Sequence, residues 1–276
     1  MGGVEWIANA RMYAVNAEVA AQWSAVLHWV ADAARVPFEI VAHAPPASLD
    51  TLWRRPDLGS AFMCGYPWTQ WDAAATRPHM LAAVVPSPAR YGGASVYCTD
   101  IVARADAGVA TLDALSTARF AYTTPTSQSG YQAVRAFFAS RAHAAGGHAF
   151  AAVVGPLVTP RAVVDAVLAG AADAGPLDSY WHDLLRRHEP ATAAHLATLA
   201  STPPTPAPPI VCAAALAPAL RERLAGVWLA AGEAPALATA RAALLIARFV
   251  RPDPAVYRSL TDLAHAADAL GYRTLQ

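Results

Sequence analysis

Apolar runs alternate with helical repeats along most of this chain. Residues 17–34 show the clearest helical period. The apolar positions that share one face of this helix are Trp23, Val26, Leu27 and Val30. Short apolar runs around it predict strands within VEWIANARMYAV, PFEIVAH, SAFMCGY and MLAAVVPSPA. This alternation is typical of an α/β fold in which helices cover both faces of a parallel sheet.

The middle of the chain repeats the same rhythm. It predicts strands at RFAYT, HAFAAVVG and AADAGPLDSY. It predicts helices over residues 129–141, over TPRAVVDAVLAG and over WHDLLRRHEPATAAHLATLA. Beyond the proline-rich stretch STPPTPAPPIVCAAAL, the pattern predicts helices alone, ending with VYRSLTDLAHAADAL. The chain therefore contains two α/β units followed by helices.

Two extended segments predict connections between lobes. One is ASVYCTDIVARAD, and the other is the proline-rich stretch, which has five prolines between Pro203 and Pro209. We predict a first lobe of residues 1–98 and 211–276, a second lobe of residues 99–200, and a return crossing at residues 201–210. Ligands in open α/β sheets bind beyond the carboxyl ends of the strands. We therefore expect a ligand cleft between the lobes.

Composition and charge exclude some classes of function. The chain has 276 residues, of which 55% are hydrophobic, and its 20 basic residues, all arginine, balance 20 acidic ones. A sizeable core is possible, and the absence of a basic excess argues against nucleic-acid binding. No apolar run reaches the roughly 18 residues of a membrane span, so we expect no membrane insertion. The start MGGVEWIANARMYAV lacks the pattern of a signal sequence, which leaves a cytoplasmic location open.

The sequence contains no motif that is typical of a metal or cofactor site. The cysteines Cys64, Cys98 and Cys212 are far apart and form no CxxC pair, so we expect free thiols. The histidines form no HxH or HExxH pattern, and the sequence has neither a GxGxxG loop nor a Walker phosphate loop. We therefore predict no bound metal and no cofactor.

The sequence TPTSQSGY places Thr126, Ser127, Gln128 and Ser129 together where a helix is predicted to begin, directly after Pro125. A helix N-terminus has unsatisfied N–H groups and roughly half a positive charge, so it attracts anions. Ordinary capping needs only one such side chain and stays an alternative. A serine nucleophile is disfavoured because the nucleophile elbow GxSxG requires a glycine before the serine. We assign no catalytic residue.

Further candidate residues follow predicted strands. Asp178 ends the strand in DAGPLD, where its carboxylate could accept from a protonated phosphate-like oxygen or an ammonium group, or could cap the next helix. We interpret His182 as a surface or capping histidine. Each of three tyrosines ends a predicted strand or lies near its end, and together they could line one pocket, although each alone also fits ordinary packing. These tyrosines are Tyr13, Tyr66 and Tyr91.

Several motifs, in this order and spacing, carry a family resemblance over nearly the whole chain. They are ARMYAV, MCGYP at 63–67, YGGASVYCTDIVARAD at 91–106, TSQSGY at 126–131 and AAVVGPLVTPRAVVDAVLAGAADAGPLD at 151–178. The chain resembles the PhnD-like family of phosphate/phosphite/phosphonate-binding proteins, the solute receptors of ABC importers. The resemblance implies an α/β, two-lobe, type II periplasmic-binding fold with two hinge crossings. It also implies a periplasmic location and an ABC permease as partner, and we expect a monomer.

The resemblance also implies which residues bind the ligand. The serine-rich helix start, here Ser127, Gln128 and Ser129, would hold a phosphorus oxyanion. Asp178 matches the acidic residue after a second-lobe strand, and the three tyrosines match pocket positions of the first lobe. The chain departs from its relatives before the helix near Thr159. They often carry Gly-Ser-His or Gly-Gly-His there, whereas this chain has GPLVTPR.

Because that histidine is missing, the ligand could differ from a simple phosphonate, and whether Arg161 compensates is open. We predict a solute-binding protein that captures a small oxyanion by hinge closure. One alternative is a cytoplasmic lyase or dehydratase of cofactor biosynthesis, with Asp178 or His182 as general acid or base. Another is a ligand-sensing domain. Binding is preferred because the candidates are donors and aromatics, not a nucleophile and a base.

Overall fold

The structure, a computed structural model, describes residues 6–106 and 108–276. The first residues of the first predicted strand, Val4 and Glu5, and the beginning of the stretch considered as a leader lie outside the described residues. The chain divides into two compact units. The first contains the described residues through Val96 together with Pro206–Val256. The second contains Tyr97–Thr205 and Tyr257–Gln276.

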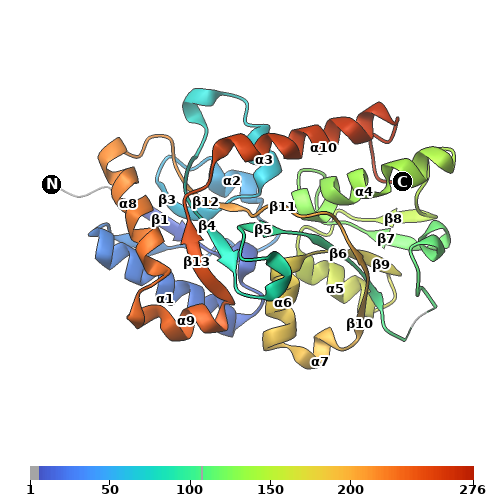
Figure 1. Ribbon diagram of the computed structural model, residues 1–276, viewed down its shortest axis with the longest axis horizontal. Coiled ribbons are helices and arrows are strands. Elements are labelled where there is room, and N and C mark those ends of the chain that lie inside the picture. The colour runs from blue at the N-terminus through green and yellow to red at the C-terminus, as the bar shows by residue number, and fades with distance from the viewer. Residues whose placement is uncertain (1–5, 107) are drawn as a thin grey trace. The chain divides into compact units, whose positions relative to one another are not determined.

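The first unit is built on a six-stranded sheet with the order β13-β4-β12-β3-β1-β2 (Figure 1). Its strands are β1 (Trp6–Asn9), β2 (Phe38–Ile40), β3 (Leu58–Phe62), β4 (His79–Pro86), β12 (Pro209–Cys212) and β13 (Ile246–Val250). β1 is parallel to β2 and β3, whereas β12 is antiparallel to both β3 and β4. The strands β1, β3 and β4 therefore run in one direction, and their carboxyl ends lie at the same edge.

The helix α1 (Ala17–Ala34) of the first unit has the bounds that the sequence predicts. The side chain of Asn16 caps it by accepting from the N–H of Val19 at 3.0 Å. Trp23 packs edge-on against Phe62 of β3, with ring centroids 4.9 Å apart. The other helices of this unit are α2 (Leu49–Trp53), α3 (Gly65–Thr69), α8 (Pro218–Ala231) and α9 (Ala238–Ala243), with short turns η1 (Arg11–Tyr13), η2 (Ala74–Thr76), η3 (Ala89–Tyr91) and η6 (Pro235–Leu237).

The second unit has a five-stranded sheet with the order β10-β6-β9-β7-β8. Its strands are β6 (Thr99–Arg104), β7 (Arg119–Ala121), β8 (Ala152–Val154), β9 (Ala174–Asp178) and β10 (Leu196–Ser201). β7 is parallel to β8 and β9, and β6 is antiparallel to β9 and β10. Both sheets are thus mixed, whereas the sequence predicted parallel ones. Phe120 of β7 stacks on Phe150 at 4.2 Å in the core of this unit.

Each parallel strand of the second unit is followed by a helix. β7 leads to a π-helical turn, η5 (Gln128–Gln132), which continues into α4 (Ala133–Ala144). β8 leads to α5 (Pro160–Leu168), and β9 leads to α6 (Ser179–His188). Because the three strands are parallel, the N-termini of their helices lie at one edge of the sheet. The remaining helices are η4 (Asp113–Thr117), α7 (Pro190–Ala193) and α10 (Arg258–Ala269), and η7 (Pro254–Tyr257) precedes α10.

The C-terminal helix belongs to a different unit from the one that the sequence predicted. The sequence assigned residues 211–276 to the first lobe, but Tyr257–Gln276 belongs to the second unit. Figure 1 shows α10 beside α4, and Ala267, Tyr272 and Leu275 are part of the second unit's core. The other two passages between the units lie at Val96/Tyr97 and Thr205/Pro206, where β5 (Val96–Tyr97) pairs with β11 (Thr205–Pro206).

Three segments were assigned wrongly from the sequence. β10 and β13 lie in stretches predicted to be helical, and β12 begins within the predicted return crossing at residues 201–210 and continues to Cys212. Alanine and leucine favour helices locally, but a partner strand outweighs that preference, since β10 pairs with β6 and β13 with β4. Pro209 is tolerated because it is the first residue of its strand.

Candidate functional site

The serine-rich segment forms a turn that opens a helix. The N–H of Ser127 donates to the carbonyl of Thr124 at 3.0 Å, and Ser127 is then the N-cap of η5. Its Oγ accepts from the N–H of Gly130 at 3.0 Å, which confirms the capping role that the sequence left open. A hydroxyl whose oxygen accepts still has its proton to donate. Capping therefore leaves Ser127 able to donate to an anion.

The first turn of this helix packs directly on the end of β7. The N–H of Thr123 donates to the carbonyl of Gly130 at 3.3 Å, and a Cβ at Gly130 would lie 1.9 Å from Oγ1 of Thr123. Gln128 is buried, whereas Ser127 and Ser129 are partly exposed and Thr126 is exposed. Of the four predicted polar residues, the side chain of Gln128 is thus the one that does not face solvent.

Thr99 lies between the serine-rich turn and Asp178. In the pairing of β6 with β9, Thr99 is opposite Asp178. The Oγ1 of Thr99 donates to the carbonyl of Ser129 at 3.0 Å. Directly paired residues of antiparallel strands have Cα atoms about 4.5–5.5 Å apart. The structure therefore brings Ser129 and Asp178, which are far apart in the sequence, to the same place at the sheet edge.

Asp178 caps the helix α6. Its Oδ1 accepts from the N–H groups of Tyr180 at 2.9 Å and Trp181 at 3.0 Å, and the residue is 6% exposed. This confirms the capping alternative for Asp178. The carboxylate nevertheless puts a negative charge beside the serine-rich turn, where an anionic ligand would meet it.

The third helix start of this edge has no histidine. Thr159 caps α5 by accepting from the N–H of Ala162 at 3.1 Å. Arg161 donates to Oε1 of Glu189 at 2.5 Å, and its guanidinium lies 5.6 Å from the centroid of the Trp181 ring. Because Glu189 balances its charge, the geometry gives no support to Arg161 as a replacement for the family histidine.

The three candidate tyrosines belong to the first unit. Tyr13, Tyr66 and Tyr91 follow β1, β3 and β4, whose carboxyl ends lie at one sheet edge. Tyr13 and Tyr91 are buried, and the Tyr13 ring packs edge-on against Phe62 at 4.8 Å. Tyr66, near the start of α3, is partly exposed. The three tyrosines therefore follow strands that end at one sheet edge, and Tyr66 is the most accessible of the three.

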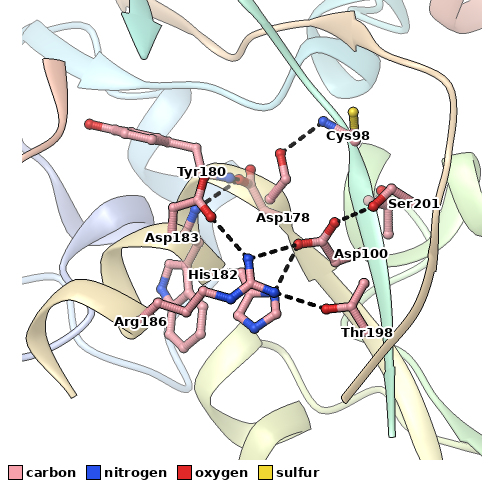
Figure 2. A network of polar contacts seen from close by, with 12 residues as sticks. Cys98, Asp100, Asp178, Tyr180, His182, Asp183, Arg186, Thr198 and Ser201 are labelled. Atoms are coloured by element: carbon pink, nitrogen blue, oxygen red, sulfur yellow. Dashed lines mark hydrogen bonds and ion pairs between the residues drawn. The ribbon is translucent and has the colours of Figure 1, made fainter. Parts of the chain in front are cut away.

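A buried polar network lies close to Asp178 in the second unit (Figure 2). His182 and Asp100 are both fully buried, with Nδ1 of His182 2.8 Å from Oδ2 of Asp100. Ser201 donates to Oδ1 of Asp100 at 2.6 Å, and Arg186 bonds to Asp183 at 3.0 Å. The interpretation of His182 as a surface or capping residue was wrong, because α6 directs this position onto β6. Successive side chains of a strand point to opposite faces of the sheet, so Thr99 and Asp100 of β6 lie on opposite faces. This alternation was the sequence signal that could have identified Asp100 as a partner for a residue of the other face.

The buried histidine predicts how stability depends on pH. Burial lowers the pKa of His182 from its ordinary value of 6.5, and the hydrogen bond to Asp100 partly opposes this effect. The folded protein therefore binds this proton less well than the unfolded chain. The stability contribution is complete above pH 6.5 and is lost as the pH falls below that value. A single group changes the free energy of unfolding by at most about 1.4 kcal/mol per pH unit.

We expect the urea-determined free energy of unfolding to fall from about pH 7 to about pH 5.5, and to fall less steeply in the His182→Gln variant. An equal slope in wild type and His182→Gln would contradict the assignment.

The described residues contain neither a cluster suited to a metal ion nor a helix suited to a membrane. Within residues 6–106 and 108–276, no three histidine, cysteine, aspartate or glutamate residues lie where they could hold a metal ion together. No helix in the described part of the chain has both the length and the apolar character needed to cross a membrane. The three cysteines are free thiols, as the sequence predicts.

Comparison with known sequences gives one family match. A sequence model of the family described as "ABC transporter, phosphonate, periplasmic substrate-binding protein" matches residues 13–257. No curated protein matches the chain.

Comparison with solved structures shows the fold. A binding protein component of an ABC phosphonate transporter from Pseudomonas aeruginosa is 16% identical, with a TM-score of 0.79 over 96% of this chain and 87% of that chain. PhnD1 from Prochlorococcus marinus, in complex with methylphosphonate, is 15% identical, with a TM-score of 0.78 and coverage of 97% and 99%. A Xanthomonas citri protein bound to ATP is 19% identical, with a TM-score of 0.66 and coverage of 98% for both chains. These neighbours confirm the predicted type II periplasmic-binding fold.

Proposed function

Because the chain belongs to the family of periplasmic substrate-binding proteins of phosphonate ABC transporters, we propose that it holds a phosphonate-like oxyanion at the start of η5. The observation that carries this proposal is the edge of the second sheet, where the helices after β7, β8 and β9 all begin. Helix N-termini attract anions through their N–H groups and dipoles. The hydroxyl groups of Thr126, Ser127 and Ser129 add donors at the helix that follows β7.

The neighbouring carboxylate suggests which oxyanions bind best. Asp178 lies opposite Thr99, whose hydroxyl bonds to Ser129, so a ligand on the serine-rich turn would be close to a negative charge. A fully ionised anion would be repelled there. A phosphonate that carries a proton, or one with an ammonium group, can instead donate to the carboxylate. We therefore expect monoprotonated phosphonates and aminophosphonates to bind more tightly than sulfonates.

The wider function follows from the family. Members capture a solute and pass it to the permease of an ABC importer, and the type II fold is suited to capture by hinge closure. We place this work in the periplasm, with Tyr13, Tyr66 and Tyr91 of the first unit as further ligand contacts. The lyase alternative is less well supported, because His182 is fully buried against Asp100.

The serines provide the direct test. We expect the double variant Ser127→Ala, Ser129→Ala to bind methylphosphonate at least about 2 kcal/mol more weakly, or about 30-fold, because two charge-assisted hydrogen bonds are lost. Calorimetric titration measures this change. Thermal shifts with phosphate, phosphite, methylphosphonate, 2-aminoethylphosphonate and a sulfonate would first rank the ligands.

Ser116→Ala serves as the control, because Ser116 is an exposed serine of the same unit whose hydroxyl donates to the carbonyl of Asp113. It should bind methylphosphonate like the wild type. Unchanged affinity in the double variant would refute the site. A wild-type protein that none of these compounds stabilises would refute the proposed ligand class.

A further inference from the structure

Two consecutive residues, Cys98 directly before β6 and Thr99 at its start, form hydrogen bonds with the first residues of two helices. The N–H of Cys98 donates to Oγ of Ser179 at 2.9 Å, and the N–H of Ser179 donates to the carbonyl of Cys98 at 2.9 Å. Ser179 is the first residue of α6 and directly follows Asp178. The next residue, Thr99, donates its hydroxyl proton to the carbonyl of Ser129 at 3.0 Å. One short segment therefore fixes both helix starts that carry candidate ligand residues.

Thr99 is also bound to the segment that returns to the first unit. Its N–H donates to Oγ1 of Thr202 at 3.0 Å, and its carbonyl accepts from the N–H of Thr202 at 2.9 Å. The second unit begins at Tyr97 and its main segment ends at Thr205. Thr99 and Thr202 are thus close in sequence to two of the three places where the chain passes between the units, and they are bonded to each other.

The hydroxyl of Thr99 is not needed for the strand itself. The backbone of β6 pairs with β9 on one side and β10 on the other. Thr99 is 1% exposed, and a buried strand position of this kind normally favours an apolar β-branched residue such as valine. The hydroxyl therefore matters for its bond to Ser129, which fixes the backbone of the turn and with it the direction of the Ser129 donors.

We propose that Thr99 is a positioning residue of the oxyanion site, and that through Thr202 it couples the serine-rich turn to two of the three segments by which the chain passes between the units. This inference rests on the proposed function, since it assumes that the turn binds an oxyanion. The bond to Ser129 holds the donors in the geometry that binding requires. The bonds to Thr202 make that geometry depend on the conformation of the passing segments.

The test compares Thr99→Val with Thr99→Ser. Valine keeps the shape and burial of threonine but removes the hydroxyl, whereas serine keeps the hydroxyl. We expect Thr99→Val to weaken methylphosphonate binding about tenfold in calorimetric titration, and Thr99→Ser to bind within about twofold of wild type. Thr202→Val, which removes the acceptor for the Thr99 N–H, should also weaken binding, although Thr202 has no bond to the turn. Unchanged affinity in Thr99→Val or in Thr202→Val would overturn the coupling.

A second measurement separates this inference from the proposed function. Hydrogen exchange of the amides at residues 128–133 can be followed in the ligand-free protein. Thr99→Val should accelerate it and Thr99→Ser should not. If the wild type binds no phosphonate, the ligand assignment fails, and this exchange still decides whether Thr99 positions the turn. If the serine double variant loses binding while Thr99→Val keeps it, the function stands and the inference is wrong.

Discussion

Replacement of Arg135 by methionine is expected to lower the free energy of unfolding by about 3–5 kcal/mol. Arg135 of α4 is 3% exposed. Its guanidinium donates to the carbonyls of Tyr272 at 2.8 Å and Ala264 at 3.0 Å. It also donates to Oε1 of Gln132 at 2.9 Å and pairs with Asp268 at 2.5 Å. Methionine fills similar space but removes the donor that these acceptors share, and the loss of hydrogen bonds at buried acceptors is costly.

Urea unfolding of the two proteins measures this effect. Arg141→Met is the matched control, since Arg141 lies on the same helix but its side chain is 51% exposed and pairs with the exposed Asp113. Exposed ion pairs contribute about 0–1 kcal/mol, so this variant should lose little stability. Equal losses in the two variants would show that the buried bonds of Arg135 do not carry the effect.

The bonds of Arg135 also attach the C-terminal helix to the rest of the second unit. Two of its acceptors, Ala264 and Tyr272, lie on or directly after α10. A third, Gln132, ends the π-helical turn and donates through Nε2 to the carbonyl of Pro125 at 2.7 Å. The C-terminal helix is therefore linked through two side chains to the turn that contains the candidate ligand residues.

Local signals in the sequence predicted much of the fold. The period of Trp23 and its neighbours gave the bounds of α1, and the polar residue at the start of the α4 region, Ser127, is the cap of its first turn. The family resemblance, confirmed by the match over residues 13–257, gave the fold class. These predictions succeeded because a period, a cap or a family motif is contained within the sequence itself.

Predictions that depended on partners far along the chain failed. β10 is a strand because β6 pairs with it, and α10 belongs to the second unit because it packs into that unit's core and bonds to Arg135. The network of Asp100 and His182 joins residues 82 positions apart. For the same reason the sequence offered Ser129 and Asp178 as separate candidates. Their common neighbour, Thr99, appears only when β6 is paired with β9.

Gly130 is the position where a single methyl group is expected to disturb the candidate site most. A Cβ there would lie 1.9 Å from Oγ1 of Thr123 and 2.9 Å from both its Cβ and its Cγ2. Threonine is short and β-branched, so it cannot swing its side chain away. The first turn of the helix must move instead. Gly130→Ala should therefore destabilise the protein by about 2–3 kcal/mol and reduce methylphosphonate binding more than tenfold.

The control is Gly226→Ala in the middle of α8, where a Cβ would meet nothing within 4 Å. At this exposed helical position alanine should stabilise the protein by about 0.5–1 kcal/mol, because alanine favours a helix more than glycine does.

Thr123→Ala removes Oγ1 and Cγ2, the two outer atoms that a Cβ at position 130 would strike. Combined with Gly130→Ala, it should restore part of both stability and binding, since only the contact with Cβ remains. Urea unfolding and calorimetric titration of the wild type, Gly130→Ala, Gly226→Ala and the double variant test this. A double variant no better than Gly130→Ala would show that the close packing of Gly130 on Thr123 is not what places the serine-rich turn.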